Sequence, residues 1–100
     1  MKIVFTDHLL IRLKQRKIPR NIVKEIFSQS LENYWDNLRN RHIVVGEVLY
    51  KGKSRKVLVA YDIIKNRIEA VTVHPITETD IDHRLYSGRW NYEKSKRKES

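Results

Sequence analysis

Three strand-like segments joined by very short connections place the strongest constraint on how this chain can fold. Each segment is rich in Val, Ile, Leu or Tyr, and the segments span roughly residues 41–50, 55–63 and 67–74. The connections at 51–54 and 65–66 have turn composition, because Gly52 and Asn66 tolerate a positive φ. Connections this short join antiparallel neighbours, so the sequence predicts an antiparallel sheet.

One short strand and two helices are predicted ahead of this sheet. Residues 2–5 form the strand, and Thr6 or Asp7 caps a helix that continues to about Lys17. A second helix over about 19–30 begins at a proline, whose missing N–H would have no intrahelical partner in the first turn. Apolar residues at helical spacing give the two helices their buried faces: Leu9, Leu10 and Leu13 in the first, and Ile22, Val23, Ile26 and Phe27 in the second.

The remaining segments are less regular. Residues 32–40 are polar and mixed, and they form either an edge strand or a loop. After the last strand, residues 77–80 resemble the start of a short third helix. The segment 91–100 has almost nothing to bury, and we expect a disordered basic tail there. The chain is therefore expected to form a single α+β domain over residues 1–90.

Composition limits the class of protein. With 100 residues the chain can close one modest core, and without cysteine it can form neither disulfides nor thiolate metal sites. The carboxylate of Asp7 interrupts the N-terminus before a signal peptide could form, and no apolar run approaches the roughly 20 residues of a membrane span. We therefore expect a cytoplasmic protein with no membrane partner.

A strong excess of positive charge is the clearest indication of a partner. The 21 Lys and Arg outnumber the 12 Asp and Glu, which gives a net charge of +9. Such a field attracts a polyanion and holds it through phosphate contacts, so nucleic acid is the expected partner. Two alternatives stay open: the charge keeps a small protein soluble, or it pairs with an acidic protein.

The first predicted helix carries a cluster that could bind phosphate. His8, Arg12 and Arg16 recur every four residues and fall on one flank of that helix. An imidazole and two guanidiniums at the border of the core could hold a phosphate away from bulk water. The same spacing also fits a solvated basic face, or arginines paired with nearby carboxylates, for which the candidates are Glu25, Glu32 and Asp36.

A second candidate, His74, ends the last predicted strand just before Pro75. From there a side chain can project toward a cleft and exchange a proton near neutral pH, although a strand-end histidine is also commonly a packing residue. His42 and His83 are weaker candidates because surface-type residues flank them. No local zinc spacing is present, and the acidic residues at 80–82 fit the first turn of a helix, so no metal and no cofactor is expected.

Basic and aromatic residues alternate toward the C-terminus. Trp90 lies between Arg89 and the tail, where its ring could stack on a base while neighbouring cations hold the backbone. Trp35 and Tyr61 are instead expected in the core. The expected nucleic-acid-binding residues are Arg84, Arg89, Trp90, Lys94, Lys96 and Arg97.

The opening pattern of the chain resembles that of a family of small toxin proteins. The parts that match are the His-x-x-x-Arg-x-x-x-Arg spacing of His8, Arg12 and Arg16, the following Lys17-Ile18-Pro19 turn, and the strand segments 55–62 and 68–74. Over about residues 2–76 the chain is similar to BrnT and RelE/ParE-type toxins. This resemblance implies a fold in which two N-terminal helices pack on a small antiparallel sheet.

The same resemblance implies a metal-independent ribonuclease of a toxin–antitoxin pair, acting on RNA rather than DNA and inhibited by an antitoxin protein. The implied reaction is attack of a ribose 2′-hydroxyl on the adjacent phosphorus, which needs a base, an acid and a cation. His8 and His74 would transfer protons in an order that the sequence leaves open, while Arg12 and Arg16 would stabilise the phosphorane. Tyr61 would be an additional donor. The alternatives are a non-catalytic nucleic-acid-binding domain and a protein-interaction domain for an acidic partner.

Overall fold

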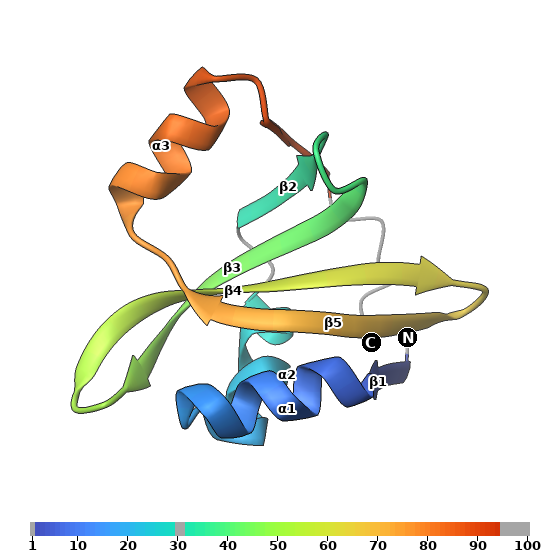
Figure 1. Cartoon of the computed structure of the whole chain (residues 1–100), viewed down its shortest axis with the longest axis vertical. Coiled ribbons are helices and arrows are strands. Elements are labelled where there is room, and N and C mark those ends of the chain that lie inside the picture. Colours follow the sequence, from blue (N-terminus) through green and yellow to red (C-terminus); the bar gives the residue numbers. More distant parts are fainter. Residues whose placement is uncertain (1, 30–31, 95–100) are drawn as a thin grey trace.

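Within residues 2–29 and 32–94, which the computed structural model describes, six strands form one mixed sheet in the order β1-β5-β4-β3-β2-β6 (Figure 1). The strands are β1 (Lys2–Phe5), β2 (Glu32–Asp36), β3 (Arg41–Tyr50), β4 (Lys53–Ile64), β5 (Arg67–Pro75) and β6 (Trp90–Tyr92). The helices in this part of the chain are α1 (Asp7–Arg16), α2 (Arg20–Gln29) and α3 (Glu78–Tyr86).

The central hairpins form as the short connections predict. β3 pairs antiparallel with β4, and β4 with β5, so the three strands expected from their composition are confirmed. In the β3–β4 turn Gly52 has a positive φ of 75° and Lys51 one of 53°, whereas in the β4–β5 turn the positive φ, 56°, falls on Lys65 and not on the expected Asn66. The segment 32–40, expected as an edge strand or a loop, contains the strand β2 at residues 32–36, followed by a turn; β2 is not an edge strand, because it pairs with β3 on one side and β6 on the other.

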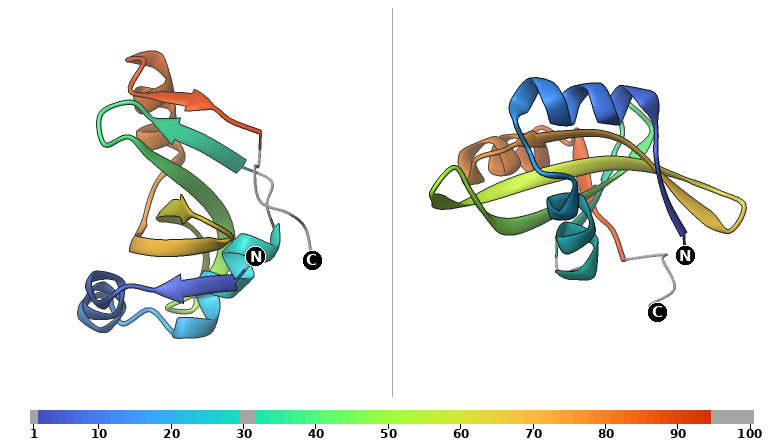
Figure 2. Two further views of the ribbon diagram at one scale, coloured as in Figure 1. Left: turned by 90° about the vertical axis from the view of Figure 1, so that its right-hand side faces the viewer. Right: turned by 90° about the horizontal axis from the view of Figure 1, so that it is seen from below.

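The expectation of a RelE-type fold, with two helices on a small antiparallel sheet, is wrong. The sheet is larger, because β2 and β6 extend it beyond β3. It is also mixed, because β1 pairs with β5 in parallel, with Lys2 opposite Arg67 and Phe5 opposite Ala70. Helices α1 and α2 pack into the core on one side of the sheet and α3 packs into the core on the other, while α1 also lies alongside β5, as Figures 1 and 2 show.

Alternating side chains on the central strands explain why both sides of the sheet carry helices. Val44 and Val59 belong to the core on the α1 and α2 side, whereas Ile43 and Leu58 belong to the core on the α3 side. All four are buried. Because both faces of β3 and β4 are apolar, one helical layer cannot cover the sheet. Most of the predicted helical faces are confirmed in the core on the α1 and α2 side, which buries Leu9, Leu13, Ile22, Val23, Ile26 and Phe27, while Leu10 is only partly buried against it.

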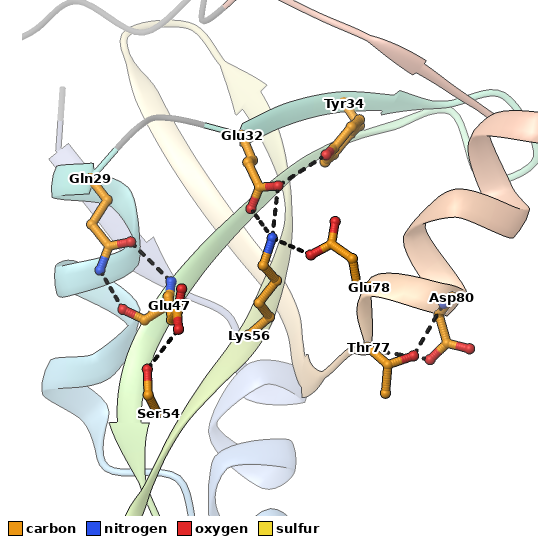
Figure 3. A network of polar contacts seen from close by, with 9 residues as sticks. All are labelled: Gln29, Glu32, Tyr34, Glu47, Ser54, Lys56, Thr77, Glu78 and Asp80. Atoms are coloured by element: carbon orange, nitrogen blue, oxygen red, sulfur yellow. Dashed lines mark hydrogen bonds and ion pairs between the residues drawn. The ribbon is translucent and has the colours of Figure 1, made fainter.

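A capping box and an ion-pair network fix α3 to the sheet at its N-terminal end (Figure 3). The Thr77 hydroxyl accepts a hydrogen bond from the Asp80 N–H at 3.1 Å, and the Asp80 carboxylate accepts one from the Thr77 N–H, so the predicted helix start is confirmed. Lys56 Nζ lies 2.6 Å from a Glu78 oxygen and 3.0 Å from a Glu32 oxygen. Glu78 first, and then Glu32, raises the pKa of Lys56 above its ordinary value. The network therefore ties α3 to β4 and β2.

The segment expected to begin a disordered tail is a strand. β6 pairs antiparallel with β2, with Tyr92 opposite Tyr34 and Trp90 opposite Asp36. The Trp90 side chain is 1% exposed, and its ring stacks on that of Tyr34 with centroids 5.0 Å apart. Glu93 continues the attachment, because its carboxylate lies 2.5 Å from His42 Nδ1. Burial of one large ring, rather than a periodic pattern, therefore holds this segment; residues 95–100 of the expected tail lie outside the described residues.

Replacement of Trp90 by Ala should lower the free energy of unfolding by about 3–5 kcal/mol, because it removes a buried aromatic ring. Tyr92→Ala is the matched control on the same strand, where the ring is 77% exposed, and should cost less than about 1 kcal/mol. Urea unfolding followed by circular dichroism measures both values. Equal losses for the two variants would contradict the placement of Trp90 in the core.

Candidate functional site

A cleft of about 350 Å³ lies on the α3 side of the sheet, where α1, α3, the β2–β3 turn and the start of β6 meet. Its apolar floor belongs to β3 and β4 and consists of Ile43, Leu58 and Ala60. Its walls are basic and consist of Arg12, Arg16, Arg39, Arg41, Arg84, Arg89, His8 and His74. Among the described residues that line the cleft, Asp36 is the single carboxylate. The cleft therefore carries a large excess of positive charge.

The first wall comes from α1, which lies beside β5 in both Figure 1 and Figure 2. Thr6 caps this helix, and its hydroxyl also donates to the Ala70 carbonyl of β5 at 3.0 Å. Leu9 and Leu13 of α1 are buried in the core, which turns the neighbouring flank of the helix toward the cleft. That flank carries His8, Arg12 and Arg16.

An irregularity in β5 shapes the side of the cleft next to α1. The pairing register between β4 and β5 shifts at Ala60 and Tyr61, so that Val71 is an additional residue in β5. Such a bulge bends a strand and changes the direction of its side chains. Val71, Thr72 and His74 all line the cleft.

Hydrogen bonding fixes the tautomer of His74. Its Nδ1 lies 2.9 Å from the Pro75 carbonyl oxygen, which can only accept, so Nδ1 carries the proton. In the neutral ring the lone pair is therefore on Nε2. Burial lowers the pKa of His74 below its ordinary value of 6.5, and the positive charges of Arg16 and Arg84 lower it further. The neutral form of His74 is thus favoured at pH 7, by burial and by the charges of Arg16 on α1 and Arg84 on α3.

His8 lies at the exposed rim of the same cleft. Arg12 Nε donates to His8 Nε2 at 3.4 Å, and Arg12 Nη1 donates to Gln15 Oε1 at 3.0 Å. The His8 ring and the Arg12 guanidinium are therefore held together one helical turn apart. An anion bound at this flank would meet both groups.

The second wall is organised around the buried carboxylate of Asp36, at the end of β2. One oxygen accepts hydrogen bonds from the backbone N–H groups of Leu38 at 2.9 Å and Arg39 at 3.1 Å. The other lies 3.1 Å from Arg89 Nη2. Burial opposes ionisation of Asp36, but the bonds from Arg89, Arg39 and Leu38 outweigh it, and the net effect lowers the pKa of Asp36 below its ordinary value. Asp36 thereby holds the β2–β3 turn and the residue before β6 next to each other.

Two of the residues that line the cleft contribute buried N–H donors that have no hydrogen-bond partner among the described residues. They are Arg16 Nη1 and Trp90 Nε1. An unpaired buried donor lowers the stability of the folded protein, and a ligand that supplies an acceptor would remove this cost. The Arg84 guanidinium lies above the Trp90 ring, 4.9 Å from its centroid, and burial, followed by the charge of Arg89, lowers the pKa of Arg84. This part of the cleft therefore favours a ligand that is anionic and rich in acceptors.

The structure brings most of the expected site residues together, although they come from distant parts of the sequence. Those that line the cleft are His8, Arg12, Arg16, His74, Arg84, Arg89 and Trp90. Lys94 is exposed beyond β6 and does not line the cleft, while Lys96 and Arg97 lie outside the described residues.

Two of the expected roles conflict with the observed packing. Tyr61 is buried in the core on the opposite side of the sheet, with its ring near those of Phe27 and His42, so it cannot act as a donor in the cleft. Trp90 is also buried, and its ring contacts Tyr34 and Arg84. Its ring face therefore cannot stack on a base.

Sequence reasoning missed Arg39, Arg41 and the role of Asp36. These residues surround the β2–β3 turn, and Arg41 also lies 3.4 Å from Asp62 of β4. The available signal was the Asp-Asn-Leu-Arg-Asn turn composition at 36–40, because an aspartate commonly accepts hydrogen bonds from backbone N–H groups two and three residues later. That signal would have predicted the turn but not its position at the cleft.

Comparisons with known proteins assign no family. No family model matches the chain, and it shows no significant similarity to the curated proteins or to the solved structures. Across residues 2–29 and 32–94, three or more His, Asp or Glu side chains do not gather in an arrangement that could hold a metal ion. None of the helices in that part of the chain has the length and apolar character needed to cross a membrane.

Asp36→Asn should lower the free energy of unfolding at pH 7 by about 2 kcal/mol, because it weakens charge-assisted hydrogen bonds around a buried group. Since the pKa of Asp36 is lowered in the folded state, the stabilisation is complete above the unfolded value of about 3.9 and is lost as the pH falls through the folded value. Unfolding free energies of the variant and the wild type should therefore converge in acid.

Asp62→Asn is the control for this prediction, because Asp62 pairs with Arg41 at a more exposed site. It should change the free energy of unfolding by less than about 1 kcal/mol. A difference between wild type and Asp36→Asn that stayed constant from pH 7 to pH 3 would contradict the role given to the Asp36 carboxylate.

Proposed function

We propose that this chain binds RNA in the cleft and cleaves it without a metal ion, by attack of a ribose 2′-hydroxyl on the adjacent phosphorus. The observation that carries the proposal is the position of a neutral His74, with its lone pair on Nε2, in a cleft walled by six arginines. A base is needed to take the 2′-hydroxyl proton, and cations are needed where charge develops on the phosphorane.

These groups would carry out the reaction with two proton transfers, one to His74 and one from His8. The phosphate binds among the arginines, with Arg16 and Arg84 on the elements that flank His74. His74 Nε2 takes the proton of the 2′-hydroxyl as the 2′-oxygen bonds to phosphorus. The bond from phosphorus to the 5′-oxygen breaks, and His8 at the rim supplies the proton that this oxygen needs. The products are a 2′,3′-cyclic phosphate and a 5′-hydroxyl.

One observation also supports a second candidate function, binding of nucleic acid without catalysis. Six arginines and one carboxylate line the cleft, and this excess of charge would hold a phosphate backbone whatever the histidines do. In either case the antitoxin protein that the toxin resemblance implies would inhibit by covering this cleft. Cleavage products distinguish the two candidates.

Purified protein should cleave single-stranded RNA in the presence of EDTA, and His74→Ala should reduce the rate at least about 100-fold, because it removes the base. His83→Ala is the matched control, because His83 is an exposed histidine of α3 that does not line the cleft. Products resolved on a denaturing gel, with circular dichroism of each variant, measure the effect. Full activity of a folded His74→Ala protein would remove His74 from the mechanism.

The cleavage rate should rise with pH along an acidic limb whose midpoint lies below 6.5, because burial and two arginines lower the pKa of the base His74. Arg84→Gln removes one of those positive charges, so it should move the midpoint upward, toward 6.5, while also lowering the maximal rate. The pH dependence of kcat/KM, together with an NMR titration of the His74 ring, measures both effects. A midpoint that fell in Arg84→Gln would contradict the assignment of His74 as the base.

A further inference from the structure

We infer that the tip of the β3–β4 hairpin is a second contact site for the RNA backbone, so that the preferred substrate is a strand extending beyond the nucleotide bound in the cleft. The inference rests on the proposed binding of RNA in the cleft. The contact site consists of Lys51, Lys53 and Arg55, and is called the hairpin patch below. Figure 1 shows this hairpin extending away from the rest of the sheet, near one end of α1.

Direct contacts place the hairpin patch next to the cleft. The Tyr50 hydroxyl donates a hydrogen bond to the backbone carbonyl of Arg16, the last residue of α1, and the Arg16 side chain lines the cleft. Lys51 Nζ lies 5.2 Å from the centroid of the Tyr50 ring, and the Arg55 guanidinium lies 6.0 Å from it. Arg55 Nε also donates to the Tyr50 carbonyl at 2.9 Å. Tyr50 therefore connects the hairpin patch to the α1 wall of the cleft.

The positive charge of the hairpin patch is not compensated within the described chain. Other basic residues of the sheet, such as Lys56 and Arg67, form ion pairs, but among the described residues no ion pair involves the hairpin patch. The nearby carboxylate of Glu47 accepts a hydrogen bond from Ser54 (Figure 3). Glu47 is opposite Lys56 in the register, and strand alternation places it on the face opposite to that of Tyr50 and Lys53. An anion with several phosphates would offset this concentration of charge.

Distance along β4 shows that the cleft and the hairpin patch would contact different phosphates. Leu58 is part of the cleft floor, and Arg55 and Lys53 precede it on the same strand by three and five residues, so alternation turns their side chains to the opposite face, the one on which Tyr50 packs. At about 3.3 Å per residue, Arg55 and Lys53 lie roughly 10 and 17 Å from Leu58. One phosphate cannot contact both sites, so the hairpin patch would bind a neighbouring part of the strand that passes Arg16 at the end of α1. Such backbone contacts do not depend on base sequence.

The test compares Lys51→Gln/Lys53→Gln with Lys24→Gln/Lys65→Gln. Each double variant removes two exposed lysines, but Lys24 lies on α2 and Lys65 lies in the β4–β5 turn, at a φ of 56° like that of Lys51. Fluorescence anisotropy would measure binding of a 2′-O-methyl RNA 12-mer, which the proposed reaction cannot cleave, and of a 2′-O-methyl dinucleotide, across a range of salt concentrations.

Loss of two backbone contacts should reduce the slope of log affinity against log salt by about 1.4 for the 12-mer, because each single-strand phosphate contact contributes about 0.7. The dinucleotide should bind the hairpin variant and the wild type alike, and the control variant should keep the wild-type slope for both ligands. An unchanged 12-mer slope in the hairpin variant would overturn the inference, as would failure of the wild type to bind the 12-mer. A reduced slope in a protein that cleaves no RNA would support the hairpin patch and contradict the proposed catalysis alone.

Discussion

The buried carboxylate of Asp36 makes the arrangement of the cleft possible. Arginines from α1, α3, the β2–β3 turn and the approach to β6 all line one small cleft, where their charges repel one another. Asp36 opposes that repulsion at one wall, through its ion pair with Arg89 and its hydrogen bonds to the turn. In the wall next to α1, the described residues supply no carboxylate, and burial, together with the charges of Arg16 and Arg84, lowers the pKa of His74.

The excess of positive charge in the cleft links the stability of the protein to its proposed function. The cations that disfavour protonation of His74 are the same groups that would stabilise a bound phosphate and the extra charge of a phosphorane. Binding an anion would reduce the repulsion among the arginines and supply acceptors for the unpaired donors of Arg16 and Trp90. Under the proposed function, the cleft would give up some stability of the free protein in exchange for affinity for a polyanion.

The local structure could largely be predicted from the sequence, because the helices, the central strands and their turns depend on nearby residues. The sheet order could not, since nothing in residues 2–5 indicates that they pair in parallel with β5. That pairing leads directly into α1 beside β5 and so brings Arg12 and Arg16 toward His74. Their common flank was visible in the four-residue spacing, but their position at a cleft was not.

The errors at the C-terminus and at Tyr61 have separate physical causes. β6 is too short to show a periodic pattern, and burial of the single Trp90 ring against Tyr34 outweighs the polar composition around it. Tyr61 belongs to a strand that is apolar on both faces, so the sequence could place it in the core but could not determine which side of the sheet it occupies. The place of Arg39 and Arg41 at the cleft could not be predicted, because it depends on the position of the β2–β3 turn, which only the assembled sheet determines.

The indole N–H resonances of the two tryptophans offer the most direct test that the cleft binds RNA. Trp90 lines the cleft and its buried Nε1 lacks a partner among the described residues, whereas Trp35 does not line the cleft and provides an internal control. On titration of the ¹⁵N-labelled protein with a 2′-O-methyl RNA 12-mer, the Trp90 indole resonance should shift in a saturable way and that of Trp35 should not. Saturable shifts of backbone amides elsewhere, with the Trp90 indole unchanged, would contradict the assignment of the cleft as the RNA-binding site.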